Sequence, residues 1–305
     1  MSDLRSRIRE RDDIHVLAAL TAVLFWGVGP ILNKTVTVGT PSIVFYRTLI
    51  GVPLMTIAAY RTGGRITRVL LRDTMVPGFL FALSFMTGFA SIKMTSVANA
   101  TLVSTLQPVL VLVAARRMFG ERLRIAQIGW SALSMAGVLV VVLAAASTSG
   151  AHVSGDLMAV ANICIWSTYF VLAKKRRLAG VHAGSFLAAA FIWAAVIIVP
   201  FGLIVSNDLG AVTGPDWLRL VGMAAGPGLV GHSLMTWSQS HLDVTIASVI
   251  GLLSPVVSTT LAWVILDESL TPFQMVGGAV VVVSLVFLVR NQRGSMVGPL
   301  EPEEM

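Results

Sequence analysis

The stretch TLQPVLVLVAARRMFGERL at positions 105–123 returns as LLSPVVSTTLAWVILDESL at positions 252–270. A shift of 147 residues superposes the two stretches without a gap, and 12 prolines in 305 residues make coincident prolines rare. The positions paired by this shift are Pro53 with Pro200, Pro108 with Pro255, Glu121 with Glu268, Leu123 with Leu270, and Gln127 with Gln274. Nearer the start of each half the shift becomes 140 and pairs Trp26 with Trp166, Leu32 with Leu172, and Lys34 with Lys174. The sequence is therefore one unit used twice.

The composition belongs to a membrane protein: 55% of the residues are hydrophobic, 12% are charged, and the mean hydropathy is +0.83. Ten apolar runs are each long enough to cross a hydrocarbon layer of about 30 Å as a helix. They lie near 14–33, 41–60, 74–92, 97–116, 125–146, 155–174, 183–205, 217–238, 244–266 and 272–289. Because the runs are continuous and do not alternate with polar residues, they exclude a transmembrane β-barrel. We expect an all-α integral membrane protein with ten transmembrane helices.

Basic residues predict how the chain is oriented, because loops rich in Lys and Arg stay in the cytoplasm. With the N-terminus inside, 18 of the 22 basic residues fall on the inner side, and Lys34, Lys93 and Arg219 on the outer. Both termini, 1–13 and 290–305, are then cytoplasmic segments of a multi-pass protein of the cell membrane. Five spans per unit return the chain to the opposite side, so the repeats 14–146 and 155–289 are predicted to be inverted.

Several functional classes are disfavoured by the sequence. The net charge of +7 is spread over short clusters and not gathered on one face, which argues against a nucleic-acid partner. The single cysteine, Cys164, leaves no disulfide or thiolate metal site, and we expect no cofactor. No zinc-protease or phosphate-loop motif is present, and Gly231-His232-Ser233 is only a fragment of a serine-protease motif. We therefore predict that the protein is not an enzyme, with an intramembrane enzyme and a non-transporting receptor as alternatives of other classes.

The repeated stretch, together with Trp26-Gly27 and Arg47, resembles the EamA repeat of the drug/metabolite transporter superfamily. The resemblance covers about 14–289. In the second copy Ser167 replaces the glycine that follows tryptophan, and Ala194 stands opposite Arg47. The resemblance implies a ten-span carrier that moves small organic metabolites, often outward, without indicating which solute.

Helix breaks near the middle of a membrane often mark a transport cavity. Pro108 and Pro255 lie mid-span, and each deprives a carbonyl four residues earlier, on Ser104 or Gly251, of its helical partner. The run Gly226-Pro227-Gly228 is a third break. We interpret the five residues Pro108, Gly226, Pro227, Gly228 and Pro255 as gating positions, with simple packing kinks as the alternative.

Candidate substrate-binding residues are the polar and aromatic side chains that lie inside the apolar runs: Trp26, Arg47, Asn99, Gln107, Asn162, Trp166, Tyr169, His232 and Ser254. Arg47 is the one cationic side chain held within a span, and it would bind a carboxylate or else snorkel to the interface. Trp26 and Trp166 are too deep for the interfacial belt, so they would contact an apolar part of the solute or serve as core residues. His232 would exchange a proton or serve as a core histidine.

Together these residues predict a secondary transporter, without ATP, that exports amino acids or related carboxylates by alternating access through a central cavity. A multidrug or organic-cation exporter of the same fold is the alternative. The expected partners are the small-molecule substrate and the lipid bilayer, with proton coupling left open and a monomer or weak homodimer as the assembly.

Overall fold

The computed structural model describes residues 2–94, 103–104, 106–119, 125–145, 153–266 and 272–292. Within these ranges every element of regular structure is helical, which confirms the predicted all-helical class for the described residues. In chain order the elements are α1 (Ser2–Thr35), α2 (Thr40–Arg61), α3 (Arg68–Met94), α5 (Gln107–Phe119), α6 (Ile125–Ala145), α7 (Val153–Leu178), α8 (Ala183–Val205), the 3-10 helix η1 (Leu209–Ala211), α9 (Gly214–Met223), the π-helix η2 (Ala224–Gly231), α10 (His232–Ser238), α11 (Val244–Ile250), α12 (Leu253–Leu266) and α13 (Pro272–Gln292).

Six helical stretches are long and apolar enough to cross a membrane: Ile14–Thr35, Thr40–Arg61, Arg68–Met94, Leu157–Leu178, Ala183–Val205 and Val244–Ile265. Two shorter apolar helices, Ile128–Val140 and Met275–Phe287, coincide with the fifth and tenth predicted spans. The eighth predicted span follows the continuous helical path α9, η2 and α10. The fourth, 97–116, lies partly outside the described residues. The full count of ten therefore stays a prediction.

Glycine caps end two of the helices and reverse the chain direction. Gly63 follows α2 with φ 84° and Gly180 follows α7 with φ 78°, a backbone region that favours glycine. After each cap the next amide reaches back to the helix, Gly64 to the Ala59 carbonyl at 2.8 Å and Val181 to the Arg176 carbonyl at 3.2 Å. Because these turns are tight, α2 and α7 each lead directly into a neighbouring antiparallel helix.

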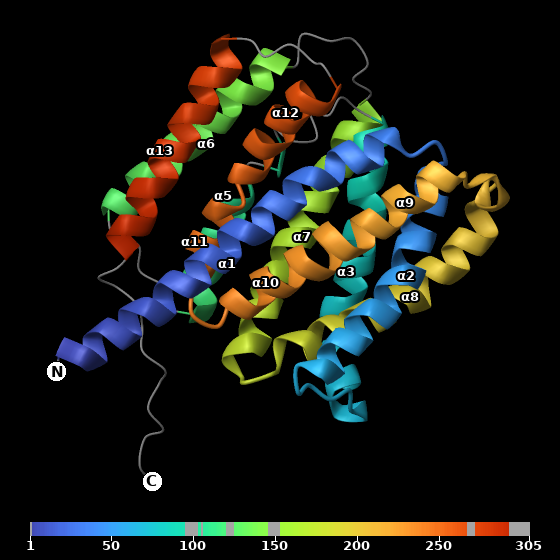
Figure 1. Cartoon of the computed structure of the whole chain (residues 1–305), viewed down its shortest axis with the longest axis horizontal. Coiled ribbons are helices and arrows are strands. Elements are labelled where there is room, and N and C mark those ends of the chain that lie inside the picture. Colours follow the sequence, from blue (N-terminus) through green and yellow to red (C-terminus); the bar gives the residue numbers. More distant parts are fainter. Residues whose placement is uncertain are drawn as a thin grey trace.

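The helices pack in pairs that join the two halves of the chain (Figure 1). Helices α6 and α13 lie side by side along one side of the bundle, and α2 packs on α8. Helix α3 packs on α7, while α1 packs on η2 and α10; α1 also packs on α12, and α5 on α7. If each helix is replaced by its counterpart in the other repeat, every one of these contacts becomes either itself or another contact that is observed.

Two interruptions break the helices near the centre of the bundle. Pro227 has no amide to donate, and around it the helix widens from α9 into the π-helix η2 before it continues as α10. The second break separates α11 from α12 at Gly251 and Leu252, three residues before Pro255. There the Gly251 carbonyl accepts a hydrogen bond from the Ser254 amide at 3.0 Å. Pro255 thus leaves this carbonyl without its i+4 helical partner, as the sequence indicates, and a shorter i+3 bond takes its place.

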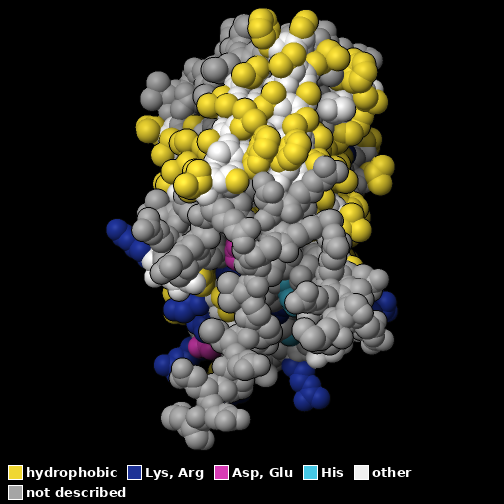
Figure 2. All heavy atoms as spheres, turned by 90° about the vertical axis from the view of Figure 1, so that its left-hand side faces the viewer, with side chains coloured by type: hydrophobic (Ala, Val, Ile, Leu, Met, Phe, Trp, Pro, Cys, Tyr) yellow, Lys and Arg dark blue, Asp and Glu magenta, His cyan; other side chains and the backbone are white. Residues whose placement is uncertain are grey.

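The face of the molecule seen in Figure 2 has an apolar part and a part with basic side chains. Figure 2 shows hydrophobic side chains covering the upper part of the face that includes α6 and α13, with Lys and Arg side chains in the lower part. The exposed apolar residues of these two helices include Ile128, Leu133, Leu139, Val282, Val283 and Phe287. An apolar surface of this extent, bordered by basic residues, is what a bilayer and its headgroups would cover.

Candidate functional site

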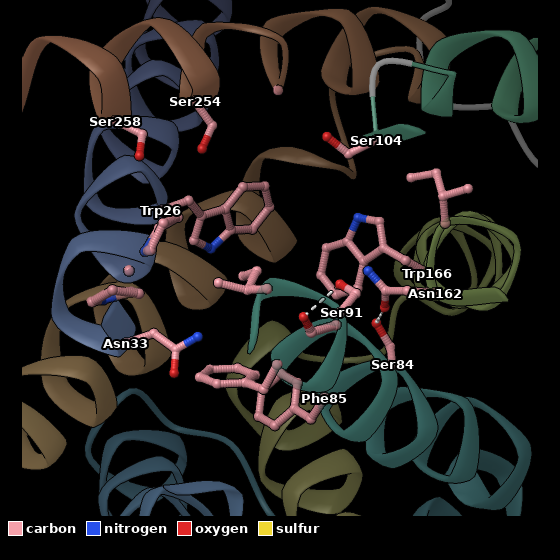
Figure 3. A pocket seen from close by; sticks show the side chains of 18 of the residues that line it. Trp26, Asn33, Ser84, Phe85, Ser91, Ser104, Asn162, Trp166, Ser254 and Ser258 are labelled. Carbon is pink, nitrogen blue, oxygen red and sulfur yellow. Dashed lines mark hydrogen bonds between the residues drawn. The ribbon is translucent and has the colours of Figure 1, made fainter. Parts of the chain in front are cut away.

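A cavity of about 300 Å³ lies between the two halves of the chain (Figure 3). Its wall combines residues of α1, α2, α3, α5, α7, η2, α10 and α12, so both repeats contribute. The lining residues of α1, α2 and α3 lie near the end of the bundle where α1 finishes and α2 begins. The cavity therefore extends from the middle of the bundle toward that end, and not toward the end that holds the α2–α3 and α7–α8 turns.

The end of the bundle with the basic turns is closed by side chains of α7. Lys174 donates to the Leu242 carbonyl at 2.6 Å, and Arg177 donates to the Thr236 carbonyl at 3.0 Å. These charge-assisted bonds fasten the end of α7 to α10 and to the loop before α11. Together the two bonds hold α7, α10 and the loop before α11 in contact at this end of the bundle.

The opposite end is held by two aspartates of the second repeat. Asp216 accepts hydrogen bonds from the Thr37 amide at 3.1 Å and the Thr37 hydroxyl at 2.6 Å, and Asp208 accepts from the Gly39 amide at 2.5 Å. Hydrogen bonds from Thr37 and Thr213 lower the pKa of Asp216 below its ordinary value. The carboxylate thus stays charged, and it ties the loop after α1 to the start of α9.

Aromatic rings form the floor of the cavity. The Trp26 ring lies 5.8 Å from the Trp166 ring, edge to face, and these rings lie 5.4 Å and 5.8 Å from the imidazole of His232. Phe85 lies 6.0 Å from the same imidazole. The buried indole nitrogen of Trp26 has no hydrogen-bond partner among the described residues. Such a floor can hold a planar or apolar group, and the Trp26 indole N–H is available to donate a hydrogen bond.

Arg47 enters the cavity from α2 and is 4% exposed. Its guanidinium lies 4.2 Å from the ring centre of Phe85 and 4.9 Å from that of Phe89, so both rings stabilise the cation. Its Nε has no partner among the described residues, and none of their carboxylates lies within ion-pair distance of it. An anionic group in the cavity would supply the missing partner.

Two asparagines line the cavity and differ in how they are bonded. The Oδ1 of Asn162 accepts from Ser84 at 2.8 Å and from Thr87 at 3.3 Å, which ties α7 to α3 (Figure 3). Asn33, on α1, is 1% exposed, and neither its Oδ1 nor its Nδ2 has a partner among the described residues. Asn162 therefore joins two helices, whereas the Asn33 amide remains open to another partner.

The structure brings most of the residues singled out from the sequence to this one cavity: Trp26, Arg47, Gln107, Asn162, Trp166, Pro227, His232, Ser254 and Pro255 all line it. Tyr169 is buried behind Trp166, 5.2 Å from that ring and 4.9 Å from Phe81, and does not line the cavity. Pro108, Gly226 and Gly228 do not line it either. Asn99 lies outside the described residues. We therefore leave Tyr169 out of the proposed binding site.

Sequence reasoning missed many residues of the cavity wall, among them Asn33, Pro30 and Phe85. Pro30 lies inside α1 and deprives the Trp26 carbonyl of its helical partner, in the same way as the prolines that the sequence reading did single out. That signal was present in the sequence. Asn33 stands beside Lys34 at the end of an apolar run and has the pattern of an interfacial residue, so only the fold shows its burial.

Comparisons with known proteins agree with this architecture. The model of the EamA-like transporter family matches residues 13–143 and again 153–290. The alignment with one solved structure covers 90% of this chain and 97% of the other chain, with a TM-score of 0.77 and 23% sequence identity. This shows a shared fold.

Three curated relatives are exporters or efflux pumps by name. The aromatic amino acid exporter YddG of Ancylobacter novellus is 32% identical over 189 residues, which span 60% of this chain and 63% of that relative. The pseudopaline exporter CntI of Pseudomonas aeruginosa is 25% identical, and a probable amino-acid metabolite efflux pump of Escherichia coli is 26% identical. Both alignments cover 92% of this chain and 97% of the relative. With its family model matched over both halves, the chain belongs to the EamA-like transporter family.

Proposed function

We propose that this protein is a secondary transporter that exports amino acids or closely related carboxylates through the cavity between its two repeats. The observation that carries the proposal is Arg47, a buried guanidinium that faces the cavity, with an Nε that no described residue partners. A buried cation is costly unless an anion pairs with it, and a solute carboxylate would fill that role during transport.

The rest of the cavity supports the same class of solute. Trp26 and Trp166 offer apolar faces beside the cation, so a solute with a carboxylate at one end and an apolar or planar group at the other fits the wall. The named relatives include an aromatic amino acid exporter and a probable amino-acid metabolite efflux pump, which supports amino acids further. The organic-cation alternative is disfavoured because the described lining residues include an arginine and no carboxylate.

Transport by alternating access requires each end of the cavity to open in turn. If the basic turns are cytoplasmic, the cavity in this structure extends toward the outside, and the Lys174 and Arg177 bonds close the cytoplasmic end. Export would then begin from a second conformation in which α7 releases the Leu242 and Thr236 carbonyls and the loop contacts of Asp208 and Asp216 close the outer end more tightly.

A flux assay with the purified protein tests the proposed function. In proteoliposomes, we expect labelled aromatic or other amino acids to move faster than through protein-free liposomes, and faster than organic cations of similar size. Running each assay with and without a pH gradient shows whether protons take part. Faster movement of cations, or no flux of any amino acid, would contradict the proposal.

Membrane orientation is tested separately with reporter fusions. A reporter that is active only in the periplasm should give signal when fused after residue 150 and none when fused after residue 178. The reason is that five spans, an odd number, place residue 150 on the side opposite to the N-terminus. The basic turn after α7 should stay inside. The reversed pattern would overturn the predicted orientation.

A further inference from the structure

Asn33 is the polar group of the cavity that the proposed site leaves unexplained. Its amide carries two donors and an acceptor with two lone pairs, is 1% exposed, and has no partner for either atom among the described residues. Buried amides without partners are rare because leaving them unpaired is costly. In the same wall, Asn162 shows the usual state, since its oxygen accepts from Ser84 and Thr87.

The position of Asn33 brings it close to the cationic part of the wall. Figure 3 shows its side chain reaching from α1 toward the side of the cavity where Phe85 lies. The guanidinium of Arg47 lies over that same Phe85 ring at 4.2 Å. Arg47 offers only hydrogen-bond donors, whereas Asn33 also offers a carbonyl oxygen as acceptor. The two side chains thus present donors and an acceptor at one end of the cavity.

This pairing matches the two charged groups that an α-amino acid carries on a single carbon atom. A carboxylate accepts hydrogen bonds and an ammonium donates them, so neighbouring partners of opposite kind are needed to bind both. No carboxylate is among the described residues that line the cavity, so the acceptor for an ammonium has to be neutral. The Asn33 oxygen is such an acceptor, and the nearby aromatic faces would stabilise the cation further.

We propose that Asn33 determines specificity for zwitterionic α-amino acids over simple carboxylates, with its Oδ1 accepting a hydrogen bond from the solute ammonium while Arg47 binds the carboxylate. The inference rests on the proposed function and narrows its substrate class. A site built only from Arg47 and the aromatic rings would transport an amino acid and its deaminated analogue alike. With Asn33, the deaminated analogue leaves the amide unpaired and is the poorer substrate.

The test compares phenylalanine with 3-phenylpropanoate, which lacks only the amino group, in proteoliposomes. Wild-type protein should prefer phenylalanine. Asn33→Leu keeps the approximate volume and removes the acceptor, so the preference should fall by about 10-fold or more while 3-phenylpropanoate transport changes little. Asn33→Asp adds a negative charge that attracts an ammonium and repels a lone carboxylate, so the preference should rise. Opposite shifts in the two variants are not expected from a merely structural residue.

The matched control is Thr35→Val on the same helix, because the Thr35 hydroxyl bonds only within α1, to the Ile31 and Leu32 carbonyls. Its preference should equal that of the wild type. If Asn33→Leu does not fold, the rise in Asn33→Asp still decides the matter. An unchanged preference in a folded Asn33 variant overturns this inference alone, provided that wild-type phenylalanine flux still depends on Arg47. Absence of any amino acid flux in the wild type overturns the proposed function itself.

Discussion

Arg47→Ala should lower the transport of a carboxylate solute by about 10- to 100-fold, because a charge-assisted hydrogen-bonded pair in a desolvated site contributes roughly 1.5–3 kcal/mol. Arg47→Lys keeps the charge but loses the planar guanidinium and its stacking on Phe85 and Phe89. Its transport rate should therefore lie between those of the wild type and Arg47→Ala. Initial rates of uptake into proteoliposomes, at several solute concentrations, measure the effect.

The matched control for Arg47 is Arg176→Ala. Arg176 is half-exposed and pairs with Asp73 at 3.4 Å on the surface, and exposed pairs contribute little. Its removal should leave transport near the wild-type rate. A wild-type rate in a folded Arg47→Ala protein would show that Arg47 only packs against its two aromatic neighbours, and the site assignment would then be wrong.

Depth within the apolar runs identified part of the cavity wall, because polar and aromatic side chains far from the ends of a span need protein or a cavity around them. Trp26, Trp166, His232 and Ser254 fall near mid-span, and all four line the cavity. The position of Tyr169 behind the cavity wall has a geometric cause. Three residues after Trp166, it lies about 4.5 Å farther along α7, where its ring packs 4.9 Å from Phe81 and 6.1 Å from Phe186.

Asn33 could not be identified in this way, because a polar residue at the end of an apolar run has the same pattern whether lipid headgroups or protein surround it. Its burial depends on how α1 is packed by the second repeat, and a single sequence does not give that contact. The same limit applies to the break between α11 and α12. Pro255 predicts a bend nearby, but the hydrogen bond from Ser254 to the Gly251 carbonyl depends on the local turn geometry.

One departure between the repeats has a visible structural consequence. Gly27 in α1 corresponds to Ser167 in α7, and the partner of Gly27 in α12, Val257, corresponds to Leu110 in α5. Where the glycine stands, α1 approaches α12 closely. Where the serine stands, a pocket of about 260 Å³ lies between α5 and α7, lined by Ser167 and Leu110 among others. The glycine after Trp26 thus marks the tighter of the two equivalent contacts.

Gly27→Ala should therefore destabilise the protein by about 1–3 kcal/mol, the usual cost of an added methyl group in a filled core. A Cβ on Gly27 would stand 2.5 Å from Cγ1 and 2.6 Å from Cβ of Val257, and 3.2 Å from the Ser254 carbonyl oxygen. Neither partner can move away easily, because valine is stiff at χ1 and the other atom is backbone. The expected readout is a lower midpoint of thermal unfolding in detergent.

Transport should fall as well, because Trp26 on α1 and Ser254 on α12 both line the cavity and would be pushed apart. Gly29→Ala on the same helix is the control for stability, since its Cβ would lie 3.7 Å from Pro227, an ordinary van der Waals contact. Equal unfolding midpoints for the two variants would show that α1 and α12 can separate without cost. The spacing of the cavity wall would then have to come from α1 packing on η2 and α10, where the same helix meets the eighth predicted span.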